Sequence, residues 1–323
     1  MKAIRIHKFG DTEDVLQYED VPVPEPKTGE VLIKVEAAAL NRADLSLRKG
    51  AYRISPDQLP VIPGREFAGT VEKLGANVSE FKAGQRVVGY PSLGGYAEHA
   101  IAAAADVRPV PDGVTAAQAA AAPTVFLTAW FGLLTDGNLK SGEWLLVQGG
   151  SSGVGTAAIQ IAKHLGAKVI ATTGSEEKAR RLRKLGADVT IDVSQDDFLP
   201  EVMRMTNNRG VDVVLEMIGG EVYQKSLQAL APGGRLFSIG GAFGSIPDTP
   251  PTLTEGRKAT RFSITNYLKA KPQDFNQLDE ILKLVAEKKF HVPIDKSFPL
   301  AETRAAQRHL QGREHFGKVM LTM

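Results

Sequence analysis

The fold is decided by the stretch Trp144-Leu145-Leu146-Val147-Gln148-Gly149-Gly150-Ser151-Ser152-Gly153-Val154-Gly155. A short apolar run ends in a cluster of glycines, and the apolar residues that follow, up to Leu165, recur at helical spacing. Gly166 then ends the predicted helix, as a glycine after the last turn commonly does. A strand, a glycine-rich turn and a helix in this order are typical of a dinucleotide site, where the backbone approaches a pyrophosphate and a helix N-terminus faces it.

The alternation of strand and helix continues on the C-terminal side of this stretch. A helix is predicted at 176–185, and further strands are predicted at 168–172, 189–191, 211–215 and 235–239. Strands that alternate with helices at this spacing form a parallel, doubly wound sheet. We therefore predict an α/β protein with a Rossmann domain over residues 125–264.

The segments that flank this domain have a different pattern. Prolines and glycines separate short strands predicted at 31–35, 70–74, 85–89 and 96–100, which suits a small β-barrel. Residues 113–135 carry no charge, but the alanines, threonines and Pro123 favour two buried helical segments over a membrane span. After residue 265 we expect a helix at 276–288 and short strands at 296–298 and 318–321.

Composition excludes several classes of function. The chain has 323 residues, which suits two domains, and 43% hydrophobic with 24% charged residues is ordinary for a globular protein. A formal net charge of +2 provides no field to hold nucleic acid or a membrane surface. The absence of cysteine excludes disulfides, thiolate catalysis and cysteine-ligated metal. The N-terminus has no apolar run typical of a signal peptide, so we expect a cytoplasmic protein.

The glycine cluster fits the dinucleotide fingerprint with one exception. Gly150 and Gly155 occupy the first and last glycine positions of G-x-G-x-x-G, whereas Ser152 replaces the middle glycine and Gly153 is an additional one. We expect the whole loop to contact the cofactor through Gly150, Ser151, Ser152, Gly153, Val154 and Gly155.

Two other interpretations of the loop remain open. Gly149, Ser151 and Gly153 also spell the G-x-S-x-G nucleophile elbow of α/β-hydrolases, in which Ser151 would attack an acyl group. Its partners would be Asp212 and one histidine, taken from His291, His309 and His315. This hydrolase interpretation lacks an HGGG-type oxyanion segment and leaves Gly155 without a role. A purely structural turn is the other alternative.

The end of the next strand predicts NADPH as the cofactor. An NAD enzyme usually places Asp or Glu there to bind the ribose hydroxyl, but this chain has Thr172-Thr173-Gly174-Ser175. Ser175 is a good helix N-cap, and Lys178 would then stand in the first turn, where the helix dipole disfavours a cation unless it faces an anion such as the 2′-phosphate. The alternative is a solvated Lys178 beside two glutamates. Gly240, after the strand at 235–239, completes the predicted cofactor contacts.

At this point the chain resembles the quinone oxidoreductase branch of the medium-chain dehydrogenase/reductase superfamily. The matching segments are Ala39–Asp44, Pro63–Gly69, Leu127–Trp130, the glycine loop with Ala158–Lys163, Ala231–Arg235 and Glu314–Val319. The resemblance implies a GroES-like barrel domain built from residues 1–124 and 265–323, with the Rossmann domain of residues 125–264 inserted between them. It also implies a homodimer that forms through edge strands of the Rossmann sheets.

The superfamily includes zinc enzymes, and the resemblance implies that this chain has lost the metal. Asn41 stands where the first cysteine ligand would be, Arg65-Glu66 replaces the His-Glu pair, and no cysteine exists to be the third ligand. Arg65 puts a fixed cation in the place of the metal. The resemblance further suggests that Asn41 lies near the nicotinamide ribose and Thr128 near the carboxamide, and that Asp44 and Tyr52 match quinone reductase positions.

These residues lead to one expected reaction. NADPH would give hydride to a conjugated acceptor, a quinone or an α,β-unsaturated carbonyl, while the protein orients the reactants. The candidate catalytic residues are Asn41, Tyr52 and Arg65, with Tyr52 and Arg65 as hydrogen-bond donors to the acceptor. The alternatives are an enoyl-thioester reductase and a non-catalytic NADPH-binding protein.

Overall fold

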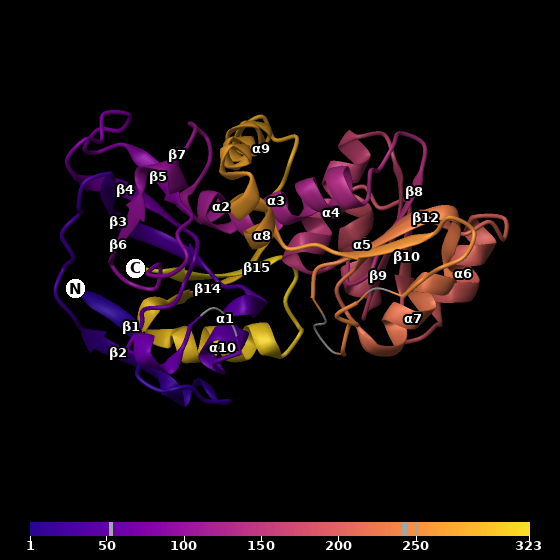
Figure 1. Ribbon diagram of the computed structural model, residues 1–323, viewed down its shortest axis with the longest axis horizontal. Helices are drawn as coiled ribbons and strands as arrows, with labels where there is room; N and C mark the ends of the chain where they lie inside the picture. The colour runs from indigo at the N-terminus through magenta and orange to yellow at the C-terminus, as the bar shows by residue number, and fades with distance from the viewer. Residues whose placement is uncertain (52–53, 241–243, 250) are drawn as a thin grey trace. The chain divides into compact units, whose positions relative to one another are not determined.

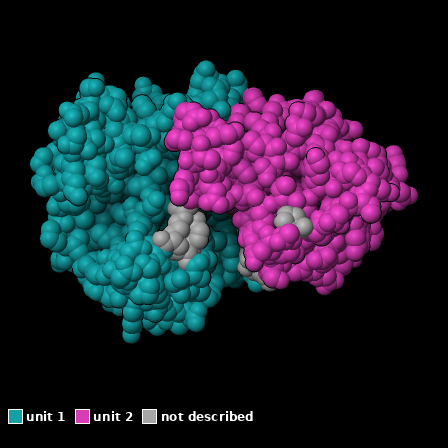
Figure 2. Space-filling model, in the orientation of Figure 1, with its two compact units in different colours: residues 1–123, 275–323 teal, residues 124–274 magenta. Residues whose placement is uncertain are grey.

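The computed structural model describes residues 1–323 except 52–53, 241–243 and 250 (Figure 1). The chain forms two compact units, unit 1 with Met1–Pro123 and Phe275–Met323, and unit 2 with Thr124–Asp274 (Figure 2). Both ends of the chain therefore belong to one unit, and the middle of the chain makes the other. The second boundary expected from the sequence, at 264–265, falls at the start of α8 (Ile264–Ala270), which belongs to unit 2.

Unit 2 contains a parallel sheet of six strands. In space they run β10-β9-β8-β11-β12-β13, and every neighbouring pair is parallel. The bounds are β8 Trp144–Val147, β9 Lys168–Thr173, β10 Val189–Asp192, β11 Val211–Glu216, β12 Leu230–Ser238 and β13 Lys258–Arg261. This order reverses direction between β8 and β11, the point where open α/β sheets bind ligands. The predicted Rossmann fold is confirmed.

Helices cover both faces of this sheet because its strands are apolar on both sides. All six residues of β11 are buried, which is the pattern of a central parallel strand. In Figure 1, α6 and α7 lie together on one side of the sheet and α4 lies on the other. The helices are α3 Pro123–Phe131, α4 Gly153–His164, α5 Glu176–Lys184, α6 Phe198–Met205 and α7 Gly220–Gln228.

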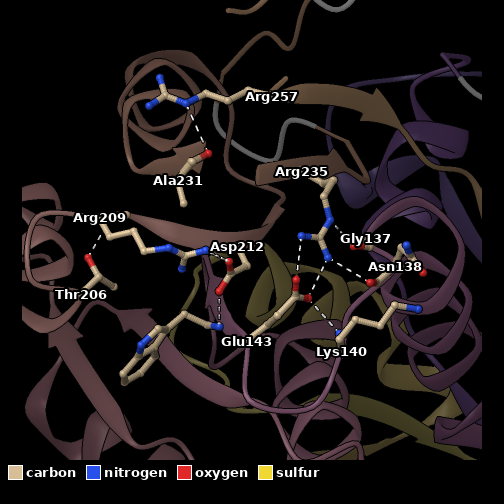
Figure 3. Close-up of polar contacts among 12 residues, drawn as sticks. Gly137, Asn138, Lys140, Glu143, Thr206, Arg209, Asp212, Ala231, Arg235 and Arg257 are labelled. Carbon is tan, nitrogen blue, oxygen red and sulfur yellow. Dashed lines mark hydrogen bonds and ion pairs between the residues drawn. The ribbon is translucent and has the colours of Figure 1, made fainter. Parts of the chain in front are cut away.

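Two groups of ion pairs and hydrogen bonds lie near the amino ends of β8, β11 and β12 (Figure 3). The Arg235 guanidinium donates to both carboxylate oxygens of Glu143, at 3.0 and 2.7 Å, and to the carbonyl oxygens of Gly137 and Asn138. The Asp212 carboxylate accepts from Arg209 at 2.6 Å and from the backbone N–H of Trp144 at 2.8 Å. The charged side chains at this edge of β8, β11 and β12 are therefore used in structural contacts.

Unit 1 is built around a curved, mostly antiparallel sheet. Its path runs β14-β15-β3-β4-β5-β7, and β6 pairs with β3, whereas β1 and β2 form a separate pair. The bounds are β1 Lys2–Ile6, β2 Leu16–Asp20, β3 Glu30–Ala39, β4 Phe67–Leu74, β5 Arg86–Gly89, β6 His99–Ala103, β7 Val107–Pro109, β14 Ile294–Pro299 and β15 Lys318–Thr322. The C-terminal strand β15 joins β3, so the two ends of the chain share one core.

Helices complete unit 1, and the sequence did not predict all of them. They are α1 Arg42–Arg48, α2 Ala116–Ala121, α9 Gln277–Ala286 and α10 Thr303–Gln311. The sequence predicted α9 but neither α1 nor α10. It also began the strand of β6 at Tyr96, whereas Tyr96 precedes the strand and is buried. The uncharged stretch at 113–135 forms α2, α3 and a π-helical turn at Gly132–Asp136, and no described helix is long and apolar enough to cross a membrane.

Candidate functional site

The glycine loop follows β8 at the carboxyl edge of the sheet in unit 2. Gly149 has φ +71°, and its N–H donates to the Thr172 hydroxyl at 3.1 Å, while the N–H of Gly150 donates to the Thr172 carbonyl at 2.8 Å. Ser152 is the N-cap of α4, because its Oγ accepts from the N–H of Gly155 at 3.0 Å. The serine that departs from the glycine fingerprint therefore caps the helix.

The two glycines that fit the fingerprint stand where a side chain has no room. A Cβ on Gly155 would lie 2.5 Å from the carbonyl oxygen of Gly149 and 2.7 Å from Cα of Gly150. A Cβ on Gly150 would lie 2.9 Å from Cδ1 of Leu182. The helix thus packs backbone against backbone on the loop, and its first-turn N–H groups, which have no acceptor inside the helix, can bind an anion. This geometry fits a pyrophosphate.

The end of β9 presents hydroxyl groups and a cation. Thr173 is buried, and its Oγ has no hydrogen-bond partner among the described residues. Ser175 caps α5 by accepting from the N–H of Lys178 at 3.3 Å, and Gly174 has open space where a Cβ would stand. Glu176, next to Lys178, pairs with Arg183 at 2.9 Å. The strand end therefore offers donors suited to a phosphate, and positions 172–175 contain no aspartate or glutamate.

Two further cofactor candidates lie on other elements. Gly240 follows β12, its φ is +125°, and the space at its Cβ position is open. Because β8, β9 and β12 are parallel, their carboxyl ends lie at the same edge of the sheet. Thr128 lies in α3, where its hydroxyl donates to the Thr124 carbonyl at 2.5 Å. The structure thus brings the loop, the end of β9 and Gly240 to one edge, while the Thr128 hydroxyl proton is used inside its own helix.

The geometry contradicts the hydrolase alternative in its choice of acid. Ser151 follows the carboxyl end of β8, whereas Asp212 lies at the amino end of the neighbouring parallel strand β11, bound to Arg209 and Trp144. The two side chains are at opposite edges of the sheet, so Asp212 does not complete a triad with Ser151. Asp212 is a structural acid. Burial alone would raise its pKa, but the hydrogen bonds from Arg209 and Trp144 hold the pKa below its usual value.

In unit 1 the candidate Asn41 belongs to a buried cluster centred on Lys318. The Lys318 ammonium is 4% exposed and donates to the Leu40 carbonyl at 2.8 Å, to Asn41 Oδ1 at 2.7 Å and to Glu66 Oε1 at 2.7 Å. Asn41 Nδ2 donates to the same Glu66 oxygen at 2.8 Å. Since an ammonium has three protons, all of them are used, and the orientation of the Asn41 amide is fixed by a donor on one side and an acceptor on the other.

Asp44 extends this buried cluster. Its carboxylate accepts from the Asn41 N–H at 2.8 Å, which forms a capping box at the start of α1, and from the Tyr96 hydroxyl at 2.6 Å. Burial raises the pKa of Asp44, and burial also raises the pKa of Tyr96 well above its usual 10. Tyr96 is therefore a phenol that donates to Asp44.

The residues at the position of the family's metal do not fit zinc. The Lys318 ammonium lies between Asn41 Oδ1 and Glu66 Oε1, the oxygens that a metal would use, and Arg65 stacks 4.3 Å from the Tyr90 ring. Within the described ranges no group of three or more His, Cys, Asp or Glu side chains could hold a metal ion. Sequence reasoning missed Lys318, although it lies in the quoted Glu314–Val319 segment. The third catalytic candidate, Tyr52, lies outside the described residues.

Comparison with known proteins agrees with both units. Residues 27–112 match the alcohol dehydrogenase GroES-like domain, and residues 153–287 match the zinc-binding dehydrogenase family. A quinone oxidoreductase of Sus scrofa is 35% identical over 329 residues, which span 100% of this chain and 98% of that protein. The chain belongs to the quinone oxidoreductase branch of the medium-chain dehydrogenase/reductase superfamily. The resemblance found in the sequence is thus confirmed, together with the GroES-like and Rossmann architecture.

Solved and curated members of the superfamily extend the comparison. The structure of Escherichia coli quinone oxidoreductase complexed with NADPH has a TM-score of 0.91 at 29% identity and covers 100% of both chains. A phenolphthiocerol/phthiocerol polyketide synthase of Mycobacterium tuberculosis is 34% identical over 314 residues, which span 96% of this chain and 14% of that much longer protein. The superfamily fold therefore occurs both as a separate enzyme and as one part of a synthase.

Proposed function

We propose that this protein is an NADPH-dependent reductase that transfers hydride to quinones or α,β-unsaturated carbonyls without zinc. The observation that carries the proposal is the carboxyl edge of the sheet in unit 2. There the capped N-terminus of α4, the glycines without room for a Cβ and the hydroxyls of Thr173 and Ser175 suit a dinucleotide. The quinone oxidoreductase relatives support the choice of acceptor.

The 2′-phosphate would be held at the end of β9. Thr173, Gly174, Ser175 and Lys178 form this end, and an acid that would repel a phosphate is absent from these positions. Ser175 and Lys178 share the first turn of α5, whose helix dipole adds to the attraction of a phosphate. The site therefore favours NADPH over NADH.

Residues of unit 1 would hold the acceptor and replace the metal. When bound, NADPH would supply hydride, that is two electrons and one proton, to the β-carbon of an enone, and a proton from water would complete the reduced product. A conjugated acceptor spreads the developing charge, so hydrogen-bond donors suffice where an alcohol would need zinc. Arg65 is the cationic donor that we nominate, Tyr52 is a second one from the sequence, and Lys318 holds Asn41 in one orientation.

An acceptor panel tests this function. Purified protein with NADPH should reduce benzoquinones, naphthoquinones or enones, and it should oxidise ethanol or benzyl alcohol with NADP⁺ at negligible rates. Metal analysis should find no stoichiometric zinc, and a chelator should leave turnover intact. Alcohol oxidation without turnover of any conjugated acceptor, or one tightly held zinc per chain that activity requires, would refute the proposal.

A second candidate function is supported by the polyketide synthase relative. An enoyl-thioester is also a conjugated carbonyl, and the same hydride addition would reduce it. The two candidates are separated by kcat/KM for crotonyl thioesters against quinones and simple enones. A thioester preference of about 100-fold, equal to about 2.7 kcal/mol of transition-state binding, would favour the second candidate.

We also propose a homodimer, formed through the edge of the sheet in unit 2. In the described chain β13 is the last strand of this sheet, and it pairs with β12 alone. A second copy could extend the sheet there, as exposed strand edges allow. Light scattering should give twice the chain mass of 34.7 kDa, and a proline at Ala259, within β13, should shift the mass to that of one chain.

A further inference from the structure

Arg65 is the first member of a four-layer stack in unit 1. Its guanidinium carbon lies 4.3 Å from the centroid of the Tyr90 ring, and Tyr90 stacks on Phe275 with centroids 5.6 Å apart and planes inclined by 13°. The guanidinium carbon of Arg108 lies 4.4 Å from the Phe275 centroid. Each of the two stacked rings is thus in contact with one guanidinium, and a cation over a ring meets its negative face.

The four layers come from four separate segments of the chain. Arg65 precedes β4, Tyr90 follows β5, Arg108 lies in β7 and Phe275 is the first residue of the second segment of unit 1. In Figure 1, β5, β7 and α9 lie together at the same end of unit 1. Arg65, Tyr90 and Phe275 are 8%, 7% and 5% exposed, so water hardly screens the stack. The fold therefore gathers these side chains in its interior.

The far end of the stack is anchored by directional bonds. Arg108 donates to the carbonyl of Val107 at 2.6 Å, to the carbonyl of Ala105 at 3.0 Å and to Oδ1 of Asn276 at 2.5 Å. The carboxylate of Asp279 lies 3.7 Å from its Nε and offsets part of the repulsion between the two arginines. Arg108 is thereby fixed in position, and it supports the Phe275 ring over which it lies.

The stack limits where the Arg65 guanidinium can form hydrogen bonds. All five N–H groups belong to one rigid group, so they move together with it. If the Tyr90 ring shifts, the guanidinium that lies over its face shifts with it. A small displacement matters, since misplacement of about 1 Å can lower a rate about 100-fold.

We propose that Phe275, acting through Tyr90, is a positioning residue that sets the position of the Arg65 guanidinium relative to the oxygen of the acceptor. The inference rests on the proposed function, because it takes Arg65 as the donor to that oxygen. Phe275 touches neither the acceptor nor the cofactor in this role. It holds the ring on which the donor lies.

The test uses Phe275→Leu, which keeps an apolar side chain but removes the ring, and Phe275→Tyr, which keeps the ring. Phe81→Leu is the matched control, because Phe81 is a buried phenylalanine of the barrel core outside the stack. Phe275→Leu should lower kcat for the best acceptor about 10-fold or more and leave the Kd for NADPH within about twofold. Phe275→Tyr should restore kcat to within about twofold, and Phe81→Leu should lower stability but not kcat.

A double variant and a spectroscopic signal make the result decisive. In a background of Arg65→Lys, Phe275→Leu should have no further effect on kcat, since residues that act as a unit are not additive. The Nε–H resonance of Arg65, assigned with Arg65→Lys, should shift in Phe275→Leu and not in Phe275→Tyr. An unchanged resonance, an unchanged kcat in folded Phe275→Leu, or an equal loss in Phe81→Leu would overturn the inference. A wild type that reduces no conjugated acceptor would overturn the proposed function instead, while the resonance still tests the stack.

Discussion

Replacement of Lys318 by methionine should break the buried cluster of unit 1 at its centre. The ammonium satisfies three acceptors, and Glu66, one of them, is 0% exposed. Methionine fills a similar volume without a charge, so the variant leaves a carboxylate buried without the cation that balanced it. Removal of one partner of a buried pair typically costs about 3–5 kcal/mol, and we expect that loss in the free energy of unfolding of unit 1.

The double variant Lys318→Met with Glu66→Leu is the control. It removes both charges, and replacement of a buried pair by apolar residues is often neutral, so it should recover most of the loss. Both tryptophans, Trp130 and Trp144, lie in unit 2, so their fluorescence does not follow unit 1. Hydrogen exchange at the amides of β3 and β15, measured across a urea series, reports the unfolding of unit 1. A single-variant loss under about 1 kcal/mol, or a double variant as unstable as the single one, would refute the reasoning.

Three further predictions follow from other positions. Lys178→Ala should weaken NADPH binding about 10- to 100-fold and leave NADH unchanged, whereas Lys184→Ala, in the last turn of the same helix, should change neither in a titration calorimeter. Gly155→Ala should destabilise unit 2 by about 1–3 kcal/mol in urea unfolding, because its Cβ would meet backbone at 2.5 Å, while Gly174→Ala, with open space, should not. Burial raises the pKa of Asp44 above 3.8, so its stabilising contribution is largest at low pH and is lost as pH rises through the raised pKa. Asp44→Asn should therefore gain stability relative to wild type across that window, and a difference independent of pH would contradict this.

Local patterns in the sequence were sufficient to predict the glycine loop and five strands of the parallel sheet of unit 2, but not α6, α7, α8 or β13. The dinucleotide site is formed by a segment of about 20 residues, which contains the strand, Gly150, Gly155 and the helix. Each of these features can be predicted from residues that are close together in the sequence. The absence of an acid at the end of β9 was equally visible. Even Ser152, an exception to the fingerprint, occupies a position where serine is a preferred cap.

The cluster and the stack of unit 1 could not be found in this way. Lys318 contacts Glu66 across 252 positions of sequence, and no periodic pattern links residues so far apart. The stack joins Arg65 to Arg108 through two rings, and a single aromatic residue in a sequence does not reveal its neighbour. Short elements such as α1 were missed because their seven residues include a buried aspartate and arginine, which hide the usual apolar pattern of a helix.

The last strands of unit 1 are synthesised after the whole of unit 2, and this order delays the completion of unit 1. Residues 124–274 of unit 2 are continuous, so the ribosome makes all of them before it makes the strands β14 and β15. At about 5–20 residues per second, β3 and β4 wait about 12–50 s for the strand that carries Lys318. During that interval the edge of β3 is exposed and the Glu66 carboxylate has not met its ammonium. Nascent chains should therefore depend on chaperones most strongly at this stage, after unit 2 has been made.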